Sequence, residues 1–177
     1  YEVFTDTLFE IGLTPNRSDA TSIIGVAQDL AAFLSIQKDA YHPVLLPSIP
    51  QVPKATAPSG FKVSVKNPIA CPRYSGIVLS NIKIGPAPVW IQQRLQAIGI
   101  KTINNVVDIT NFILHEMGQP LHAFDADQIH GKEIIVETKR SGTPFLALDN
   151  QVYNLHEEDL MICDGAGSPM CIGGVYG

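Results

Sequence analysis

The sequence predicts an α+β fold, in which a short strand–helix piece precedes a larger mixed domain of helices and strands. Apolar residues repeat at helical spacing over 88–98 and 104–117, and they alternate at strand spacing over 61–66 and 133–138. Five prolines fall within 41–60, which excludes a regular element there and indicates an extended linker. The chain has 177 residues, 45% of them hydrophobic, which is enough for one real core with a small appendage.

The N-terminal piece is predicted to be a strand over 5–13 followed by a helix that runs to about Leu34. The intervening TPNRSD consists of residues typical of a turn, and Ser18 or Asp19 can cap the helix. The helix has an apolar face that is expected to pack on a core: Ile23, Ala27, Leu30, Ala31 and Leu34. The proline-rich segment is the best domain boundary in the chain, and it separates a segment at 1–40 from a mixed domain at 61–177.

The mixed domain is expected to alternate between strands and helices. The predicted strands cover 61–66, 74–84, 133–138 and 145–149, and the predicted helices cover 88–98 and 104–117. Glycines end both helices, Gly99 as a C-cap and Gly118 as a stop. The chain then closes with a hairpin in which LMICD and MCIGGVYG flank a DGAGSP turn.

Composition excludes several classes of protein. No apolar run approaches the ~20 residues that a membrane span needs. The net charge is −5 and the 12 basic residues are scattered, which argues against a stand-alone RNA-binding protein. Three cysteines without metal-ligand spacing predict a reducing, cytoplasmic compartment. Cys163 and Cys171 lie in apolar surroundings and are expected to be small core residues.

Two groups of polar residues stand out as candidates for a site. His122 lies in GQPLHAFD, a loop stiffened by Pro120 directly after a helix, where it could meet a ligand or bond to backbone. The other histidines lie in loops or near a helix end, and His130 is expected to face solvent. The preceding helix is rich in side chains that are poor helix formers, which suggests capping or a site: Asn104, Asn105, Asp108, Thr110 and Asn111. Capping explains Thr110 and Asn111 less well than it explains the others.

Several ordered motifs resemble the β subunit of bacterial phenylalanyl-tRNA synthetase. The matching strings are LTPNRSD (13–19), CPRYSG (71–76), IGPAP (84–88), INNVVDITN (103–111), GQPLHAFD (118–125) and the terminal IGGVYG (172–177). The resemblance spans nearly the whole chain, and the proline-rich linker is its weakest part.

The resemblance implies two domains and an activity. Residues 1–40 would belong to a small helical domain, and 61–177 would be an incomplete editing domain built around an unusual β-sandwich core flanked by helices. The implied activity is hydrolysis of tyrosine attached in error to phenylalanine tRNA. A pocket sized for phenylalanine rejects an added hydroxyl by only ~10²-fold, so a second site that reads the hydroxyl can remove the error.

The resemblance also implies a set of site residues. Thr110, Asn111 and His122 would be the catalytic set: Thr110 and Asn111 would line the pocket, and Asn111 and His122 would hold the terminal adenosine and a water near the ester carbonyl. Pro120, Gly174 and Gly177 would bind the substrate, the two glycines by leaving room for the tyrosyl group. In the family, the acidic residue that reads the tyrosine hydroxyl lies beyond the position of Gly177. The isolated chain is therefore expected to fold but to be weak or inactive.

The implied partners are phenylalanine tRNA and an α subunit, in a tetramer of two α and two β subunits. No cofactor is expected in this chain, because ATP and magnesium would act elsewhere in the parent synthetase, and no metal site is expected. The alternative hypothesis is a non-catalytic structural or tRNA-docking module of the same synthetase.

Overall fold

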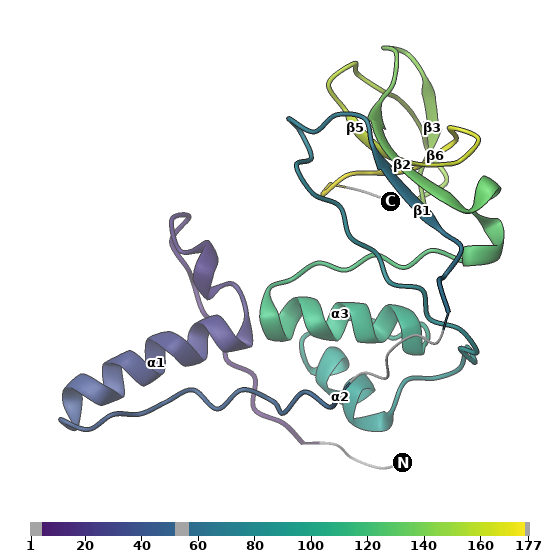
Figure 1. The fold of residues 1–177 in the computed structure, drawn as a ribbon. Helices are drawn as coiled ribbons and strands as arrows, with labels where there is room; N and C mark the ends of the chain where they lie inside the picture. The colour runs from purple at the N-terminus through teal and green to yellow at the C-terminus, as the bar shows by residue number, and fades with distance from the viewer. Residues whose placement is uncertain (1–4, 52–56, 176–177) are drawn as a thin grey trace. The chain divides into compact units, whose positions relative to one another are not determined.

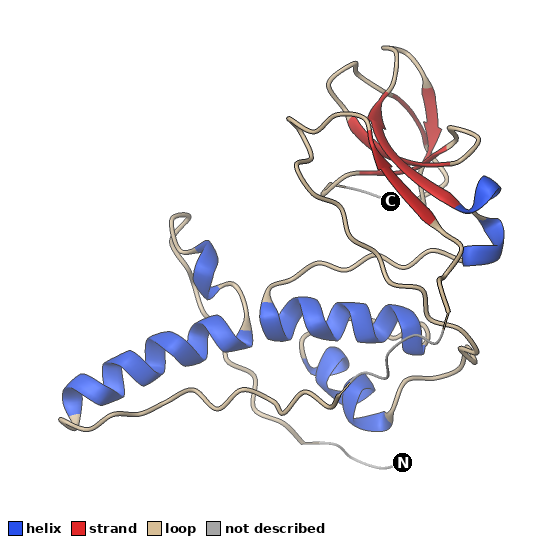
Figure 2. Ribbon diagram, in the orientation of Figure 1, coloured by secondary structure: helices blue, strands red, loops and turns tan. Residues whose placement is uncertain are grey.

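The computed structural model describes residues 5–51 and 57–175. The chain forms two compact units, and each is built from two separate segments. The first unit comprises Tyr1–Val52 and Asn81–Ala123, and the second comprises Pro53–Ser80 and Phe124–Gly177. Within the described residues, the α-helices belong to the first unit and the strands to the second (Figure 2). The α+β class predicted from the sequence is confirmed.

These units do not coincide with the segments expected at 1–40 and 61–177, because residues 81–123 group with the N-terminal segment. A contact unit groups residues that pack together, whereas a domain is a part of the chain that folds on its own. The assignment of the domains therefore stays a prediction.

Three α-helices make up the regular structure of the first unit: α1 (Ile23–Gln37), α2 (Val89–Ala97) and α3 (Asn105–Met117) (Figure 1). A 3-10 turn, η1, covers Ser18–Ala20. The predicted cap at Ser18 or Asp19 is wrong, because that turn occupies both residues and the hydroxyl of Ser22 caps α1 by accepting the N–H of Gly25 (3.0 Å).

The small core of the first unit lies between α2 and α3. Ala87, Ile91 and Leu95 are buried, and Ile100 and Phe112 pack against them. The ring of Phe112 also meets the ring of Trp90 edge-on, with centroids 5.1 Å apart. The apolar face predicted for α1 is buried only in part, because Ile23 and Leu30 are exposed, whereas Ala27, Ala31 and Leu34 are half-buried.

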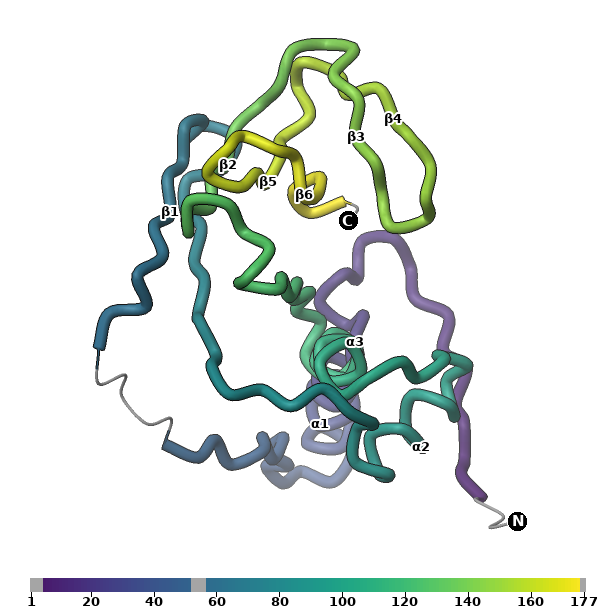
Figure 3. The backbone as a smooth tube through the Cα atoms, turned by 90° about the vertical axis from the view of Figure 1, so that its right-hand side faces the viewer, coloured from purple at the N-terminus to yellow at the C-terminus, as the bar shows by residue number. Residues whose placement is uncertain are grey.

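The second unit contains two sheets. One has four strands in the order β1-β2-β5-β6: β1 (Lys62–Val65), β2 (Glu133–Thr138), β5 (Leu160–Asp164) and β6 (Pro169–Ile172). β1 lies parallel to β2, with Lys62 opposite Glu133, and the other pairs are antiparallel. The other sheet is the hairpin of β3 (Pro144–Leu146) and β4 (Val152–Asn154) (Figure 3).

Each face of the four-stranded sheet carries its own apolar cluster. On one face, Ile135, Met161 and Cys163 pack with Phe145, Ala147 and Leu155, which come from β3 and the chain around the hairpin. On the other face, Ile134, Val136, Ile162 and Cys171 pack with Ile129 and with partly buried residues from before and after β1. Cys163 and Cys171 are core residues, as predicted.

Two predicted strands are wrong. Residues 5–13 and 74–84 have no regular secondary structure, and apolar side chains such as Phe9 and Ile77 are exposed in them. Alternating apolar residues make a strand only where a second strand offers its backbone N–H and C=O groups. The positive φ of Asn81 (60°) further breaks the second segment.

Candidate functional site

The polar residues of α3 divide into those that build the helix and those that remain for a site. Asn104 is the N-cap, and its side-chain oxygen accepts the N–H groups of Val106 and Val107, both at 3.0 Å. This interaction satisfies two of the N–H groups that a helix start leaves without partners. The capping role predicted for Asn104 is confirmed.

Asp108 fixes the residue before the cap. Its side chain is fully buried, and its carboxylate accepts the N–H of Ile103 at 2.8 Å. A buried carboxylate without a donor would cost several kcal/mol, so this bond compensates for its burial. Asp108 therefore has a structural task in the geometry of α3.

Asn105 ties the start of α3 to an earlier segment of the chain. Its backbone N–H donates to the carbonyl of Gly85 (2.7 Å), and its side-chain oxygen accepts the N–H of the same glycine (3.3 Å). Its side-chain amide donates to the carbonyl of Lys83 (3.0 Å). The sequence alone suggested only a cap for Asn105, because nothing in its spacing reveals a partner about 20 residues away.

Thr110 and Asn111 occupy the middle of α3, and both are half-buried. The hydroxyl of Thr110 donates to the carbonyl of Val107 (2.8 Å), so its proton is committed to the helix and its oxygen can still accept a hydrogen bond. The two residues are adjacent in sequence and therefore point about 100° apart around the helix axis.

The loop after α3 begins at Gly118, whose φ of 75° is the left-handed conformation that ends many helices. The predicted stop at Gly118 is thus confirmed. Pro120 and His122 follow on the exposed part of this loop. Partial burial of the His122 ring lowers its pKa, because desolvation penalises the imidazolium. The neutral ring, which can accept a proton, is therefore the favoured form at neutral pH.

Four of the predicted site residues, Thr110, Asn111, Pro120 and His122, belong to α3 and its following loop in the first unit. Gly174 belongs to the second unit, where it has a φ of 73° and open space around the position of a Cβ. That φ is itself a reason for glycine. Gly177 lies outside the described residues.

The second unit contains a polar pair, His130 and Asp164, that no pattern in the sequence predicted. His130 lies in the 3-10 turn η3 (His130–Lys132), and its Nδ1 is 2.6 Å from a carboxylate oxygen of Asp164 at the end of β5. The imidazole is exposed, as expected, but the carboxylate is buried. The other oxygen of Asp164 accepts the N–H groups of Ala166 (3.0 Å) and Ser168 (2.8 Å), which confirms the predicted hairpin turn.

Other chemistry is limited in the part of the chain that the structure describes. There, no three His, Cys, Asp or Glu side chains come together as ligands for a metal ion. Burial raises the pKa of the Cys171 thiol to about 11, so this thiol stays protonated at neutral pH. Over 5–51 and 57–175, no helix is both long enough and apolar enough to cross a membrane.

Comparison with known proteins assigns the family. The profile of the B3/4 domain matches residues 70–177. The chain belongs to the B3/4 domain family. The matched range includes α2, α3 and their loops as well as β2 to β6, so the family assignment covers most of the elements described above.

Similarity also extends beyond the B3/4 domain to the whole chain. It is 49% identical over 178 residues to the phenylalanine–tRNA ligase beta subunit of Porphyromonas gingivalis, and the match covers 100% of this chain and 21% of that protein. The protein of the same name from Bacteroides fragilis is 45% identical over 177 residues, with the same coverage. That of Geobacter sulfurreducens is 46% identical over 174 residues, covering 97% of this chain and 21% of the relative. The chain thus spans about a fifth of the length of these relatives.

Proposed function

We propose that this chain is the part of a phenylalanine–tRNA ligase β subunit that carries the editing site for tyrosine attached to phenylalanine tRNA. The observation that carries the proposal is the full-length similarity, at 49% identity, to a protein of that name. The placement of Thr110, Asn111, Pro120 and His122 on one helix and its following loop supports it. The partners proposed with it are phenylalanine tRNA and an α subunit, in an α2β2 tetramer in the cytoplasm.

The reaction would be hydrolysis of an activated ester. A water oxygen attacks the tyrosyl carbonyl carbon, the bond from that carbon to the ribose oxygen breaks, and the ribose hydroxyl leaves with a proton. His122, neutral at physiological pH, would accept the proton of the attacking water. Asn111 and Thr110 would position the terminal adenosine and the ester. Positioning lowers the barrier strongly for an activated ester, which needs no Ser or Cys nucleophile. ATP and magnesium would act elsewhere in the synthetase.

The test is deacylation of tyrosyl-tRNA by a full-length synthetase that carries this segment. His122→Ala is expected to slow deacylation by about 10²-fold or more, because a positioned general base contributes about 10²- to 10⁴-fold. The wild-type rate should rise with pH to a plateau through a midpoint below 6.5, since the pKa of His122 is lowered from that value. The variant should lose this dependence. An unchanged rate would remove His122 from the mechanism, and a lower rate with an unchanged pH profile would leave it a positioning residue.

A second candidate function is a structural or tRNA-docking module without catalysis. The observation that favours it is that Asn104, Asn105 and Asp108 are all engaged in holding α3 in place. Replacing Thr110, Asn111 and His122 together by Val, Leu and Phe distinguishes the two functions. A structural module would keep the fidelity of the synthetase, whereas an editing site would lose it and release tyrosyl-tRNA.

A further inference from the structure

The first turn of α3 is joined to residues 83–85 through a single side chain and its own backbone. Asn105 makes three hydrogen bonds to this segment, two with Gly85 and one with Lys83. Asn105 thereby pairs with backbone N–H and C=O groups of residues 83–85, as the backbone of a neighbouring strand would. The bonds of Asn104 and Asp108 are different in kind, because they stay within α3 and the residue before its cap.

The other contacts of α3 do not fix its rotation in the same way. Phe112 packs edge-on against Trp90 and against the cluster of Ala87, Ile91 and Leu95. The hydrophobic effect is non-directional and an edge-on ring pair tolerates a broad range of centroid distances, whereas hydrogen bonds need an angle as well as a short distance. A rotation of about 20° around the helix axis would keep much apolar contact but would displace side-chain tips by about 2 Å, given a helix radius of about 5–6 Å.

We propose that Asn105 is a positioning residue for the editing reaction, setting the rotation and axial position of the helix that carries Thr110 and Asn111. The inference rests on the proposed function, because it concerns the same site. A misplacement of about 1 Å in a site that works by positioning can cost about 10²-fold in rate. Loss of the link to residues 83–85 should therefore appear in catalysis more than in substrate affinity.

The experiment measures kcat and KM for deacylation of tyrosyl-tRNA by a full-length synthetase carrying this segment. Asn105→Ala is expected to lower kcat by about 10- to 100-fold with KM within about 3-fold of the wild type. Asn105→Asp keeps an acceptor for Gly85 and favours the helix start, but its oxygen repels the carbonyl of Lys83. It should lower kcat while the melting temperature is retained. Charging with phenylalanine by the same preparations reports intact assembly.

Gln92→Ala is the matched control. The amide of Gln92 donates to the carbonyl of Ala87 (2.6 Å), so this variant also removes a side-chain-to-backbone bond in the first unit, but one that does not involve α3. It is expected to leave kcat unchanged. A fall in kcat equal to that of Asn105→Ala would show a general effect and overturn the positioning role.

The remaining outcomes separate the inference from the function on which it rests. If the wild-type synthetase fails to deacylate tyrosyl-tRNA, the proposed function fails and the inference fails with it. If the wild type is active and both Asn105 variants keep kcat within about 2-fold, the positioning role is overturned and the proposed function stands. If Asn105→Ala loses activity only in proportion to its melting temperature while Asn105→Asp keeps both, Asn105 acts through stability and the positioning role is again overturned.

Discussion

The two units differ in what holds their elements in place. The second unit buries an apolar cluster on each face of its four-stranded sheet, and paired strands fix the register. The first unit has a small cluster of three buried residues, and α1 keeps large apolar side chains such as Phe33 and Ile36 exposed. Its helix α3, which carries the candidate residues Thr110 and Asn111, is held in addition by the directional bonds of Asn104, Asn105 and Asp108. The difference teaches that the geometry of the candidate site depends on a few polar side chains more than on core volume.

The largest effect is expected from opening the core of the second unit. Phe145→Ala should lower the free energy of unfolding by about 3–5 kcal/mol, because Phe145 is fully buried and its removal leaves a cavity. Leu95→Ala in the smaller cluster of the first unit should cost about 2–3 kcal/mol, since a small cluster collapses more readily. Urea unfolding of the 177-residue chain measures both. Equal losses would contradict the contrast between the units, and the exposed Leu146→Ala serves as the control, with a change within about 0.5 kcal/mol.

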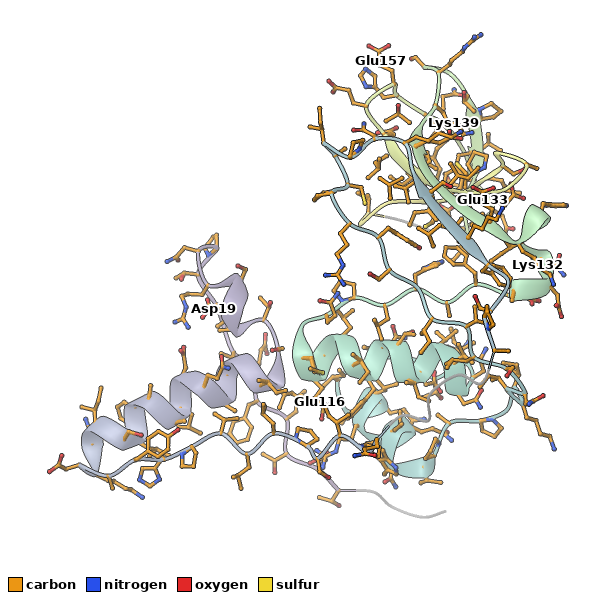
Figure 4. The ribbon with its side chains drawn as sticks, in the orientation of Figure 1. Asp19, Glu116, Lys132, Glu133, Lys139 and Glu157 are labelled. Atoms are coloured by element: carbon orange, nitrogen blue, oxygen red, sulfur yellow. The ribbon has the colours of Figure 1, made fainter. Side chains whose placement is uncertain are left out.

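A smaller effect is expected from the ion pairs of Glu137 in the second unit. Lys139 follows β2 and is labelled in Figure 4. Its ammonium donates to a carboxylate oxygen of Glu137 and to the carbonyl of Gly167, both at 2.6 Å. Burial works to raise the pKa of Glu137, but hydrogen bonds from Lys139 and Lys66 outweigh it and lower the pKa.

Lys139→Met should therefore cost about 2–3 kcal/mol, because it leaves the carbonyl of Gly167 unpaired and weakens the hold on a largely buried carboxylate. Lys66→Met removes the other partner of Glu137, but from a more exposed side chain, and should cost less than about 1 kcal/mol. Urea midpoints measure both losses. If Lys66→Met lowered the free energy of unfolding as much as Lys139→Met, burial of the lysine side chain would not determine the size of the loss.

An effect smaller than that of Lys139→Met at neutral pH, but the clearest effect at acid pH, is expected from Asp164. Burial works to raise its pKa, but hydrogen bonds from Ser168, His130 and Ala166 outweigh it and lower the pKa. A carboxylate whose folded pKa is depressed stabilises the fold above the unfolded pKa of about 3.9 and loses that contribution as pH falls through the folded pKa. Urea midpoints of the wild type should therefore fall below about pH 4.

Asp164→Asn should flatten this acid limb and lower stability at neutral pH by about 1–2 kcal/mol. An acid limb identical to that of the wild type would assign the acid sensitivity to other carboxylates. The exposed Asp19 of the first unit provides the comparison. Its pKa is lowered by the hydrogen bond from Arg17, but solvent screens that pair, so Asp19→Asn should leave the acid limb in place.

Local patterns in the sequence predicted the elements that local chemistry specifies. The helix expected over 104–117 is α3, because Asn104 caps one end and Gly118 ends the other, and the strand expected over 133–138 is β2. The strands expected over 5–13 and 74–84 are wrong, because apolar alternation does not tell whether a partner strand exists. Part of the second segment instead serves α3, since Lys83 bonds to Asn105.

The candidate site was predictable only in part for the same reason. The density of polar residues on α3 identified this helix as a candidate for the site, and the family resemblance selected Thr110 and Asn111 on it and His122 in the loop that follows. Spacing could not assign Asn105 and Asp108 to structural bonds, nor pair His130 with Asp164, which lies 34 residues later. Such pairs are decided by how distant segments meet in the fold.

The parallel pairing of β1 with β2 has a consequence for synthesis. Lys62 lies opposite Glu133, so 71 residues must follow it out of the ribosome before this pair can form. At a synthesis rate of about 5–20 residues per second, the backbone of β1 stays unpaired for roughly 4–14 s. During that interval α2 and α3 are synthesised and can form before Glu133 appears, since helices form within microseconds. Lys62 begins β1 and Lys66 follows it directly, so positive charge lies at both ends of the unpaired strand. These charges disfavour pairing of β1 with another nascent chain.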